Sequence, residues 1–338
     1  MKKPTLALTL GDPCGIGPEV LLKSLSSKKV VESCHPLVVG DAQILGLKNW
    51  GTSLKIRPIL NPLEARYKPG IVDVLHIPSE KSQQFILGKP SRESGKSSFL
   101  SVQKSIELAL LGLVDGVVHG PISKLAWKWA GVPYPGQTEM IAEQCHNPKV
   151  AMAILSEPLR TVLVTRHIPL KKVSQELSIK NIGETLSLTH DWLKNYLKKS
   201  PSIGVCALNP HAGESGTIGR EEIKIIIPAI KQAQKKVSWS IVGPLSADAA
   251  FRDHKNGFYD ALITLYHDQS LIPLKLFNCE ALVNLTIGLP FPRTSPGHGT
   301  AFDIAGKNKA SEQPMIAAIL CAVKMVNPNN SVGSVNRE

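Results

Sequence analysis

Three short β-type runs, each followed within a few residues by a histidine, constrain this chain more than any other feature. The runs and their histidines are Thr161 to Thr165 with His167, Ile203 to Leu208 with His211, and Ala261 to Leu265 with His267. Helical patterns alternate with them, at Ile182 to Leu197, Glu221 to Gln234 and Ala247 to Asp253. Alternating strands and helices predict a mostly parallel sheet, whose functional groups gather at the carboxyl ends of its strands. We therefore expect an α/β fold with three imidazoles at one edge of a sheet.

The residue types at these strand ends point to a metal. Neutral imidazoles are good ligands for zinc and similar divalent ions, and three protein ligands with one open position form a catalytic arrangement. Asp268, Glu214 and Asp248 are acidic neighbours that could orient the imidazoles. His119 also follows a β-type run and is a rival ligand. The other histidines lack this context and are expected to be structural: His35, His76, His146, His190, His254 and His298.

Cations and an amide follow the third histidine. Lys275, Asn284 and Arg293 lie downstream of it, and a polar loop, Thr294 to Thr300, comes next. Arginine forks onto phosphate or carboxylate, while lysine contributes a point charge. Each residue alone is typical of a surface. Together with Thr138 at a helix start, they predict a substrate that carries phosphate.

Two segments begin with features that favour anion binding. The strand-like Thr5 to Leu10 runs into GDPCGIGPE, residues 11–19, where Pro18 suits the first position of a helix. This turn is similar to a phosphate cradle but matches neither GxGxxG nor a P-loop, so a tight turn without a ligand is an equal interpretation. A second helix is expected to begin at Gly136 to Glu139, with Thr138 as its N-cap. Its backbone N–H groups could bind an anion, or the residues could form a simple cap.

Local patterns predict the remaining elements. Strands are expected at Leu37 to Val39 and Asp115 to Val118, helices at Ser97 to Leu113 and Gln313 to Val326, and strands with loops across residues 48–97.

Composition limits the class of protein. With 338 residues, 43% of them hydrophobic and 20% charged, the chain can bury a large core and is expected to form two lobes. Its net charge of +12 indicates a lysine-rich solvated surface or nucleic-acid binding. The basic residues are scattered and aromatics make up only 5%, which argues against a nucleic-acid platform. A basic protein also favours small anionic substrates.

The cysteines and the N-terminus bear on the cell compartment. Six cysteines without a CxxC pair or short framework spacing are typical of reduced, mostly buried thiols in a cytosolic protein. The apolar run after the two N-terminal lysines is too short for a signal-peptide core, and no segment reaches membrane-spanning length. We expect a cytoplasmic protein without a membrane partner.

Several motifs occur in a recognisable order between Thr5 and Ala322: GDPCGIGPE, GPISK, GQTE, TRHIPL, NPHAGE, GPLSAD, YHDQ and VNLTIGLPFPRTSPGHGTAFDIAG. Together they resemble the 4-hydroxythreonine-4-phosphate dehydrogenase family of pyridoxal phosphate biosynthesis. The resemblance implies two α/β/α lobes with a cleft, as in isopropylmalate and isocitrate dehydrogenases. It also implies a homodimer with the active site at the subunit interface.

The same resemblance implies the organisation of the chain and its cofactors. Residues 1–330 would form one catalytic unit, with the N- and C-terminal segments in one lobe and the central segment in the other, and 331–338 would be a polar tail. The fold binds NAD without the Rossmann glycine fingerprint, and NADP is the alternative. Zinc suits three imidazoles, with magnesium or cobalt as alternatives.

Site residues follow from the resemblance position by position. The metal ligands would be His167, His211 and His267, the last supplied by the neighbouring subunit. The substrate-binding residues would be Gln137, Thr138, Lys275, Asn284 and Arg293. The catalytic base stays open, with Lys124, Asp248 and Asp268 as candidates. One departure is Gln137, because the family pattern reads GHTE where this chain reads GQTE. Glutamine keeps a donor and an acceptor but cannot become positively charged.

The expected reaction is NAD-dependent oxidation of 4-phosphooxy-L-threonine at C3, followed by decarboxylation to 3-amino-2-oxopropyl phosphate, in pyridoxine 5'-phosphate biosynthesis. The departure at Gln137 favours one alternative, an oxidative decarboxylase of threonate or erythronate 4-phosphate. Two other classes stay open: a metal-dependent acyl- or phosphoryl-transfer enzyme on a related fold, and a non-catalytic binding protein.

Overall fold

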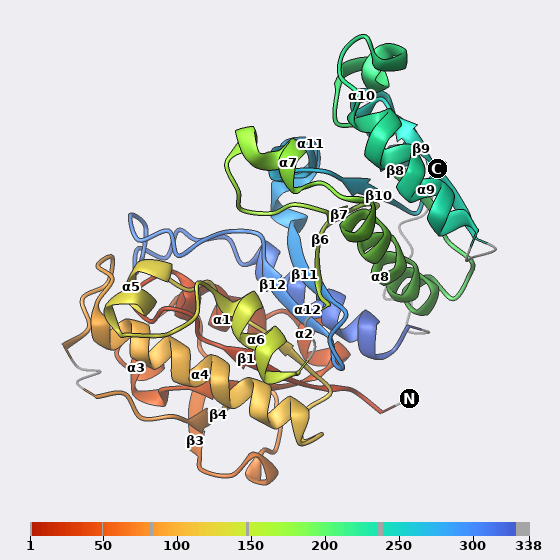
Figure 1. Cartoon of the computed structure of the whole chain (residues 1–338). Coiled ribbons are helices and arrows are strands. Elements are labelled where there is room, and N and C mark those ends of the chain that lie inside the picture. Colours follow the sequence, from red (N-terminus) through yellow and green to blue (C-terminus); the bar gives the residue numbers. More distant parts are fainter. Residues whose placement is uncertain (1, 49, 81–83, 147–148, 236–238, 329–338) are drawn as a thin grey trace. The chain divides into compact units, whose positions relative to one another are not determined.

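The structure is a computed structural model that describes residues 2–48, 50–80, 84–146, 149–235 and 239–328 (Figure 1). The expected polar tail, 331–338, lies outside the described residues. The chain divides into two compact units, Met1–Pro148 with Leu289–Glu338, and Lys149–Gly288. Each unit contains a sheet with helices, so the expected α/β class is confirmed.

The sheet of the first unit is parallel in its described pairings. Its strands lie in the order β3 (Lys55–Ile59), β4 (Ile71–His76), β2 (His35–Gly40), β1 (Thr5–Thr9), β5 (Gly116–Val118) and β12 (Arg293–Pro296). Residues 294–296 were expected in a polar loop and instead belong to β12, where Arg293 pairs with Val117. The segment forms a strand because its side chains are buried and Thr294 bonds to the carbonyl of Ala318.

The helices of the first unit include one that starts earlier than its pattern predicts. They are α1 (Gly17–Leu25), α2 (Lys28–Ser33), α3 (Ala42–Gly46), α4 (Arg92–Leu110), α5 (Lys124–Trp129), α6 (Gln137–Gln144) and α12 (Gln313–Val326), with the short η1 (Pro62–Glu64). α4 was expected from Ser97, but Ser91 and Ser94 exchange side-chain-to-backbone hydrogen bonds of 3.0 Å and cap it at Ser91. α12 has the predicted bounds.

Close packing of α4 against α5 builds the core of the first unit. A Cβ added at Gly95 would lie 2.2 Å from the carbonyl oxygen of Ala126, so only glycine allows this approach. Trp127 is fully buried here, and its indole N–H donates to the hydroxyl of Ser98 at 2.9 Å. The same core includes Val117 of β5 and Met140 and Ile141 of α6, so it fixes both elements in place.

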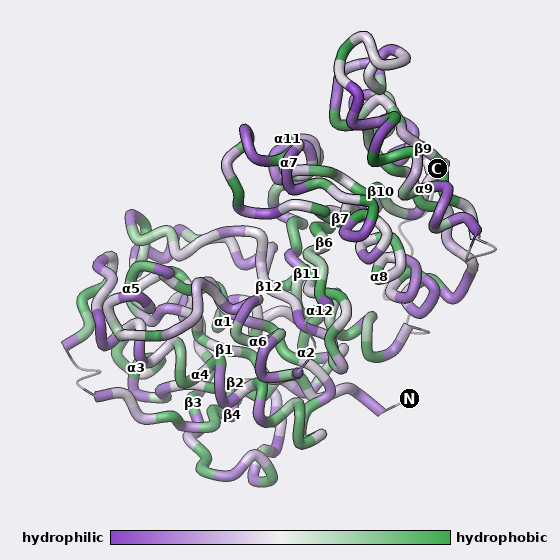
Figure 2. The backbone as a smooth tube through the Cα atoms, viewed as in Figure 1, coloured by the Kyte–Doolittle hydropathy of each residue, from purple (hydrophilic) through white to green (hydrophobic). Residues whose placement is uncertain are grey.

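The second unit combines parallel and antiparallel strands. Their order is β11 (Val283–Ile287), β6 (Ala151–Ser156), β7 (Leu159–Leu163), β10 (Ala261–Thr264), β8 (Ser202–Cys206) and β9 (Ser240–Leu245). The pairs β11–β6 and β6–β7 are antiparallel, while β7, β10, β8 and β9 run parallel. The mostly parallel sheet expected from the alternating pattern is confirmed. Hydrophobic residues concentrate in strands such as β10 (Figure 2).

The helices of the second unit contain one irregular segment. They are α7 (Val173–Glu176), α8 (Ile179–Leu197), α9 (Ile227–Gln234), α10 (Ala247–Lys255) and α11 (His267–Asn278), with the short turns η3 (Leu170–Lys172), η4 (Pro210–Gly216), η5 (Glu222–Ile226) and η6 (Cys279–Ala281). The helix expected over Glu221 to Gln234 begins as a π-helical turn, η5. Pro228 explains the wider turn, because it lacks an N–H and its ring would clash with the carbonyl four residues earlier.

The burial of the cysteines agrees with the expectation that most of them are buried. None of the six forms a disulfide, and Cys14, Cys34, Cys206 and Cys321 are buried. Within the described residues, no helix combines the length and apolar character needed to cross a bilayer.

Candidate active site

The three histidine-bearing strands are neighbours in the sheet, as the pattern predicted. β10 lies between β7 and β8 and runs parallel to both (Figure 1). In register, Thr264 lies opposite Leu163, and Ile263 lies opposite Val205. The carboxyl ends of all three strands therefore reach the same edge of the sheet.

Side-chain hydrogen bonds tie these strand ends together. Thr165 donates its hydroxyl hydrogen to the carbonyl of Leu265 at 2.6 Å, which joins the segment after β7 to the end of β10. The buried Gln269 accepts from the backbone N–H of Leu265 at 2.7 Å and donates to the carbonyl of Ala207 at 2.8 Å. Sequence reasoning did not assign this role to Gln269, although it stands in the YHDQ motif. The hydrogen bonds of Thr165 and Gln269 therefore connect the backbone segments that precede the three histidines.

Two of the predicted metal ligands lie together. The ring centroids of His167 and His267 are 5.5 Å apart, with an interplanar angle of 45°. Asp268 Oδ1 lies 2.7 Å from His267 Nδ1. A neutral imidazole that donates from Nδ1 to a carboxylate keeps its lone pair on Nε2, the form that binds a metal. Asp268 therefore acts on the orientation of His267, as the sequence predicted for an acidic neighbour.

His211 lies in a left-handed stretch of backbone. Its φ is 52°, and Ala212, Glu214 and Ser215 also have positive φ, as does Gly213. Each non-glycine residue in this conformation costs about 1 to 2 kcal/mol, so the surrounding structure must hold it. The sequence carried no signal for this run beyond Gly213. Such strain is a feature of functional loops.

The buried Glu222 holds this loop. One carboxylate oxygen accepts from the backbone N–H groups of Leu208 and Asn209 at 2.9 and 2.8 Å, and the other accepts from the Asn209 amide at 2.9 Å. A Cβ at Gly213 would lie 2.6 Å from that second oxygen. Sequence reasoning missed Glu222, whose partners lie 13 and 14 positions away.

Asp248 lies within electrostatic reach of His211. Its pKa is lowered chiefly by the hydroxyl of Ser246, which donates to it at 2.8 Å, and to a smaller extent by the charge of His211. Asp248 is exposed at the start of α10. It is therefore an acidic neighbour of His211. Its described contacts do not mark it as the catalytic base.

The three predicted histidine ligands match a divalent metal in their chemistry but only partly in their placement. His167 and His267 have the right chemistry and lie close together, and His211 follows the neighbouring strand. Among the described residues, however, no three His, Cys, Asp or Glu side chains are already arranged around a common metal position. The ligand set His167, His211 and His267 stays a prediction.

Arg293 is the best-defined cation of the predicted site. It is 2% exposed, at the first position of β12. Its Nε donates to His119 Nδ1 at 3.3 Å, and its Nη2 donates to Gln137 Oε1 at 2.6 Å. Burial lowers the pKa of Arg293 to about 10, partly offset by the carboxylate of Glu139. A guanidinium buried in a fixed orientation, with two of its nitrogens held by neutral side chains, has the forked donor geometry that matches a carboxylate or a phosphate.

His119, the rival metal-ligand candidate, lies in a buried hydrogen-bonded cluster. Both of its ring nitrogens are engaged, Nδ1 with Arg293 and Nε2 with the hydroxyl of Ser105 at 3.0 Å. Burial, and then the charge of Arg293, lower its pKa well below the ordinary value. His254 is structural as expected, since its ring joins the backbone N–H of Arg160 to the carbonyl of Tyr259.

The start of α6 differs from its prediction. Gly136 is the N-cap, without a side-chain cap, and Thr138 lies inside the first turn. Threonine was expected as the cap, but the extended backbone at Gly136 begins the helix two residues earlier. Gln137 donates its amide to the carbonyl of Gly120 at 3.1 Å and accepts from Arg293, so its side chain is engaged at both ends. Gln137 and Thr138 are both buried.

The remaining candidates differ in exposure. Lys124 is exposed at the start of α5, and a Cβ at Gly136 would lie 3.9 Å from its Nζ, so it stands beside α6. Lys275 is exposed on α11. Two buried polar atoms have no hydrogen-bond partner within the described part of the chain: Oδ1 of Asn284, on β11, and Nη1 of Arg166, next to His167. Buried polar atoms of this kind are costly and suit a ligand; the sequence did not point to Arg166.

The turn GDPCGIGPE packs tightly and is not a phosphate cradle. The N–H groups of Asp12, Gly15 and Ile16 donate to backbone carbonyls, and that of Cys14 donates to the Asp12 carboxylate. A Cβ at Gly17 would lie 1.9 Å from the Leu10 oxygen. The tight-turn interpretation is therefore correct.

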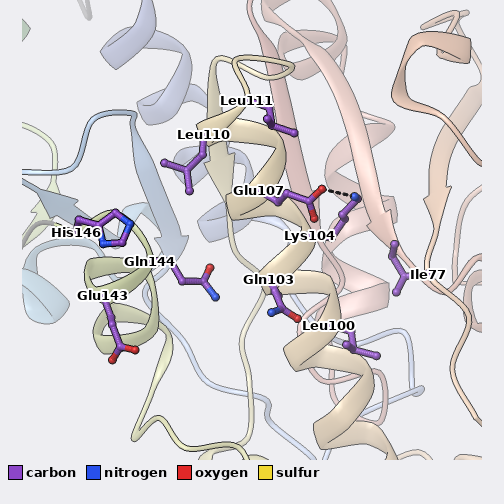
Figure 3. Close-up of a pocket in the computed structure, with 10 residues that line it drawn as sticks. All are labelled: Ile77, Leu100, Gln103, Lys104, Glu107, Leu110, Leu111, Glu143, Gln144 and His146. Carbon is purple, nitrogen blue, oxygen red and sulfur yellow. Dashed lines mark hydrogen bonds and ion pairs between the residues drawn. The ribbon is translucent and has the colours of Figure 1, made fainter.

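One surface depression lies away from these residues. It has a volume of about 920 Å³ and lies between α4 and the end of α6, lined by Ile77, Leu100, Gln103, Lys104, Glu107, Leu110, Leu111, Glu143, Gln144 and His146 (Figure 3). Lys104 and Glu107 form an ion pair of 2.7 Å in its lining, and Glu143 adds a second carboxylate. None of the predicted site residues lines it.

The structure thus defines an α/β protein of two units, with strand-end imidazoles in one unit and a buried arginine in the other. The chain belongs to the family described as pyridoxal phosphate biosynthetic protein PdxA, whose sequence model matches residues 32–322. This confirms the resemblance found in the motifs.

Individual relatives agree with this assignment. The chain is 40% identical over 335 residues to a 4-hydroxythreonine-4-phosphate dehydrogenase of Geobacter metallireducens, covering 98% of each chain. It is 37% identical over 329 residues to the D-threonate 4-phosphate dehydrogenase of Salmonella typhimurium, covering 96% of this chain and 100% of the relative. The crystal structure of 4-hydroxythreonine-4-phosphate dehydrogenase from Klebsiella pneumoniae matches with a TM-score of 0.88 and 35% identity, over 96% of this chain and 100% of that chain.

Proposed function

We propose that this protein is an NAD-dependent dehydrogenase that oxidises 4-phosphooxy-L-threonine at C3, after which the product loses carbon dioxide to give 3-amino-2-oxopropyl phosphate. The reaction would serve pyridoxine 5'-phosphate biosynthesis in the cytoplasm. The observation that carries the proposal is the buried Arg293 in a chain of this family, because a desolvated guanidinium held in a fixed orientation is built to pair with an anionic group.

Binding of the substrate falls to residues with distinct chemistry. Arg293 would form a forked pair with the phosphate or the carboxylate, and Gln137 and His119 hold two of its nitrogens in place. Asn284 would use its unpartnered Oδ1 to accept a hydrogen bond from a substrate hydroxyl or ammonium group. Lys275 would add a mobile point charge, and Thr138 a hydroxyl at the start of α6.

His167, His211 and His267 would hold a divalent metal, with zinc the best match to three imidazoles. When bound, that ion would lower the pKa of the C3 hydroxyl and stabilise negative charge on its oxygen, while NAD would accept the hydride. Asp268 orients the His267 ring, and Glu222 holds the His211 loop. Closeness of His167 and His267 within one chain supports their acting together. A homodimer that exchanges His267 between subunits stays a prediction of the resemblance.

Three residues are candidates for the base that removes the hydroxyl proton: Lys124, Asp248 and Asp268. The carboxylate of Asp268 contacts His267, and that of Asp248 accepts from Ser246 and lies within electrostatic reach of His211. Lys124 stands beside the start of α6, where Gln137 and Thr138 lie. Lys124 would accept the hydroxyl proton only as the neutral amine, since an ammonium group has no lone pair, so the choice of base among the three candidates stays open.

The second candidate function is oxidation of threonate or erythronate 4-phosphate. Gln137 favours it, because this residue departs from the pattern of the resembled family and contacts the buried Arg293. A relative named D-threonate 4-phosphate dehydrogenase covers 96% of the chain, against 98% for the biosynthetic relative from Geobacter metallireducens. The two substrates differ at C2, where one carries an ammonium group and the other a hydroxyl.

NADH formation separates the two functions. The purified protein is supplied with NAD and zinc, magnesium or cobalt, and then with each phosphorylated substrate in turn. We expect the larger kcat/KM with 4-phosphooxy-L-threonine and no turnover in His167→Ala. Turnover with the sugar acid alone would establish the second function, and no turnover with either substrate and any metal would refute both.

A further inference from the structure

A buried chain of side chains leads from α4 to Arg293. Ser105 and His119 are both 0% exposed, and Arg293 is 2% exposed. The hydroxyl of Ser105 lies 3.0 Å from Nε2 of His119, whose Nδ1 accepts from Arg293 Nε at 3.3 Å. The guanidinium of Arg293 is thus bonded to the His119 ring, whose second nitrogen is held by Ser105.

The direction of each hydrogen bond in this chain follows from donor chemistry. Arginine Nε carries a hydrogen and cannot accept, so Nδ1 of His119 must be the acceptor. The ring proton of the neutral imidazole is then on Nε2, which donates to Ser105 Oγ. Ser105 can accept this bond because its own hydrogen goes to the carbonyl of Val102 at 2.7 Å. All three bonds point one way, and a single tautomer of His119 satisfies them.

The surroundings also keep the imidazole neutral. A protonated His119 would direct an N–H and a positive charge at the guanidinium of Arg293. Burial of the ring, followed by the charge of Arg293, lowers the pKa of His119 well below its ordinary value. The acceptor at Nδ1 is therefore present throughout the neutral pH range.

We propose that His119 and Ser105 are positioning residues that set the plane of the Arg293 guanidinium for the anionic group of the substrate. Gln137 holds Nη2 and His119 holds Nε, and two fixed nitrogens determine the plane of a rigid fork. The inference rests on the proposed role of Arg293 in anion binding. It assigns the imidazole no contact with the substrate.

Two substitutions of His119 separate this role from simple packing. Asn places its amide oxygen near the position of Nδ1 and keeps the acceptor, whereas Gln places its amide near Nε2 and loses it. Calorimetric titration with inorganic phosphate measures the anion affinity of each variant. We expect His119→Asn to stay within about threefold of the parent, and His119→Gln to lose about tenfold or more, the value of a hydrogen bond to a charged group.

Ser105→Ala provides a second variant that leaves the imidazole in place. Without the serine oxygen the proton on Nε2 has lost its acceptor, so the far side of the ring is no longer fixed, although Arg293 still faces the lone pair on Nδ1. Ser101→Ala is the matched control, since Ser101 is a buried serine on the same helix that bonds only to the carbonyl of Ser97 among its described contacts. We expect weaker phosphate binding in Ser105→Ala alone, with similar melting temperatures for both.

The outcomes distinguish this inference from the proposed function. If Arg293→Ala binds phosphate as the parent does, the anion-binding role of Arg293 is wrong, and the inference is overturned with it. If Arg293→Ala loses binding while His119→Asn and His119→Gln bind equally well, the role of Arg293 stands and the positioning role is overturned. Should His119→Gln fail to fold, equal affinities in the two serine variants overturn it.

Discussion

Arg293 Nη2 donates a hydrogen bond of 2.6 Å to Oε1 of Gln137, which lies 156 positions away in the sequence. The amide nitrogen of Gln137 is also engaged, because it donates to the carbonyl of Gly120. Gln137 therefore holds the guanidinium from one side and the end of β5 from the other. Its neutral side chain does this without adding charge beside a buried cation.

Arg293→Lys should impair substrate binding even though it keeps the positive charge. A lysine ammonium cannot reach His119 and Gln137 in the forked geometry of a guanidinium. We expect KM for the phosphorylated substrate to rise by about tenfold or more, with a smaller change in kcat. Steady-state kinetics at fixed NAD measures this. An unchanged KM would show that Arg293 does not bind the substrate.

Gln137→His should make anion binding depend on pH. A neutral histidine accepts from Arg293, but a protonated one repels it, and an unperturbed histidine becomes protonated below about pH 6.5. We expect phosphate affinity in the variant to fall as the pH drops through this range, relative to the parent protein at each pH. Parallel calorimetric titrations across the range check the difference. Parallel curves for the two proteins would contradict the proposed contact.

Asp12→Asn should stabilise the protein at neutral pH. Burial raises the pKa of Asp12 from 3.8 to about 6, despite hydrogen bonds from Cys14 and Ser94 that lower it. Between these two pH values the unfolded chain releases its proton first, so stability falls as the pH rises and stays lower above pH 6. The shift corresponds to at most about 3 kcal/mol.

Urea unfolding of both proteins across this pH window tests the effect of Asp12. The advantage of Asp12→Asn over the parent should be smallest below pH 3.8 and should grow until about pH 6. A difference that does not change with pH would show that Asp12 ionises normally.

Gly213→Ala should destabilise the His211 loop. The new Cβ would lie 2.6 Å from the Glu222 carboxylate, at a φ of 78°. Gly257→Ala is the matched control, because Gly257 has a φ of 87° and nothing within 4 Å of its added Cβ. In both variants the left-handed backbone should lower the free energy of unfolding by about 1 kcal/mol. Gly213→Ala should lower it by about 1 to 3 kcal/mol more, because the new methyl group displaces the hydrogen bonds of Glu222. Equal unfolding free energies would mean that Glu222 does not brace the loop.

The histidine-bearing edge of the sheet could be predicted from the sequence because it depends on local patterns. Each β-type run is a short apolar stretch that ends before polar residues, and parallel strands carry their carboxyl ends to one edge. β7, β10 and β8 are adjacent, as this reasoning requires. The helix over Gln313 to Val326 was likewise readable from its apolar pattern.

The contacts of Arg293 could not be predicted in the same way. His119 is 174 positions away and Gln137 is 156, so their meeting depends on the tertiary fold. The sequence could offer His119 only as a rival metal ligand, because a histidine after a β-type run has the same local pattern whether its ring faces a metal ion or an arginine. The left-handed run around His211 was equally invisible, since Glu222 holds it from another element.

The central claim is that the imidazoles after β7, β8 and β10 bind one divalent ion, and equilibrium dialysis with zinc tests it most directly. We predict one zinc per chain in the parent protein, and a loss of affinity of about tenfold or more in each of His167→Ala, His211→Ala and His267→Ala. His190→Ala is the control, because that ring stacks on Trp239 in the same unit. Parent-like zinc binding in all three variants, or none in the parent, would contradict the account.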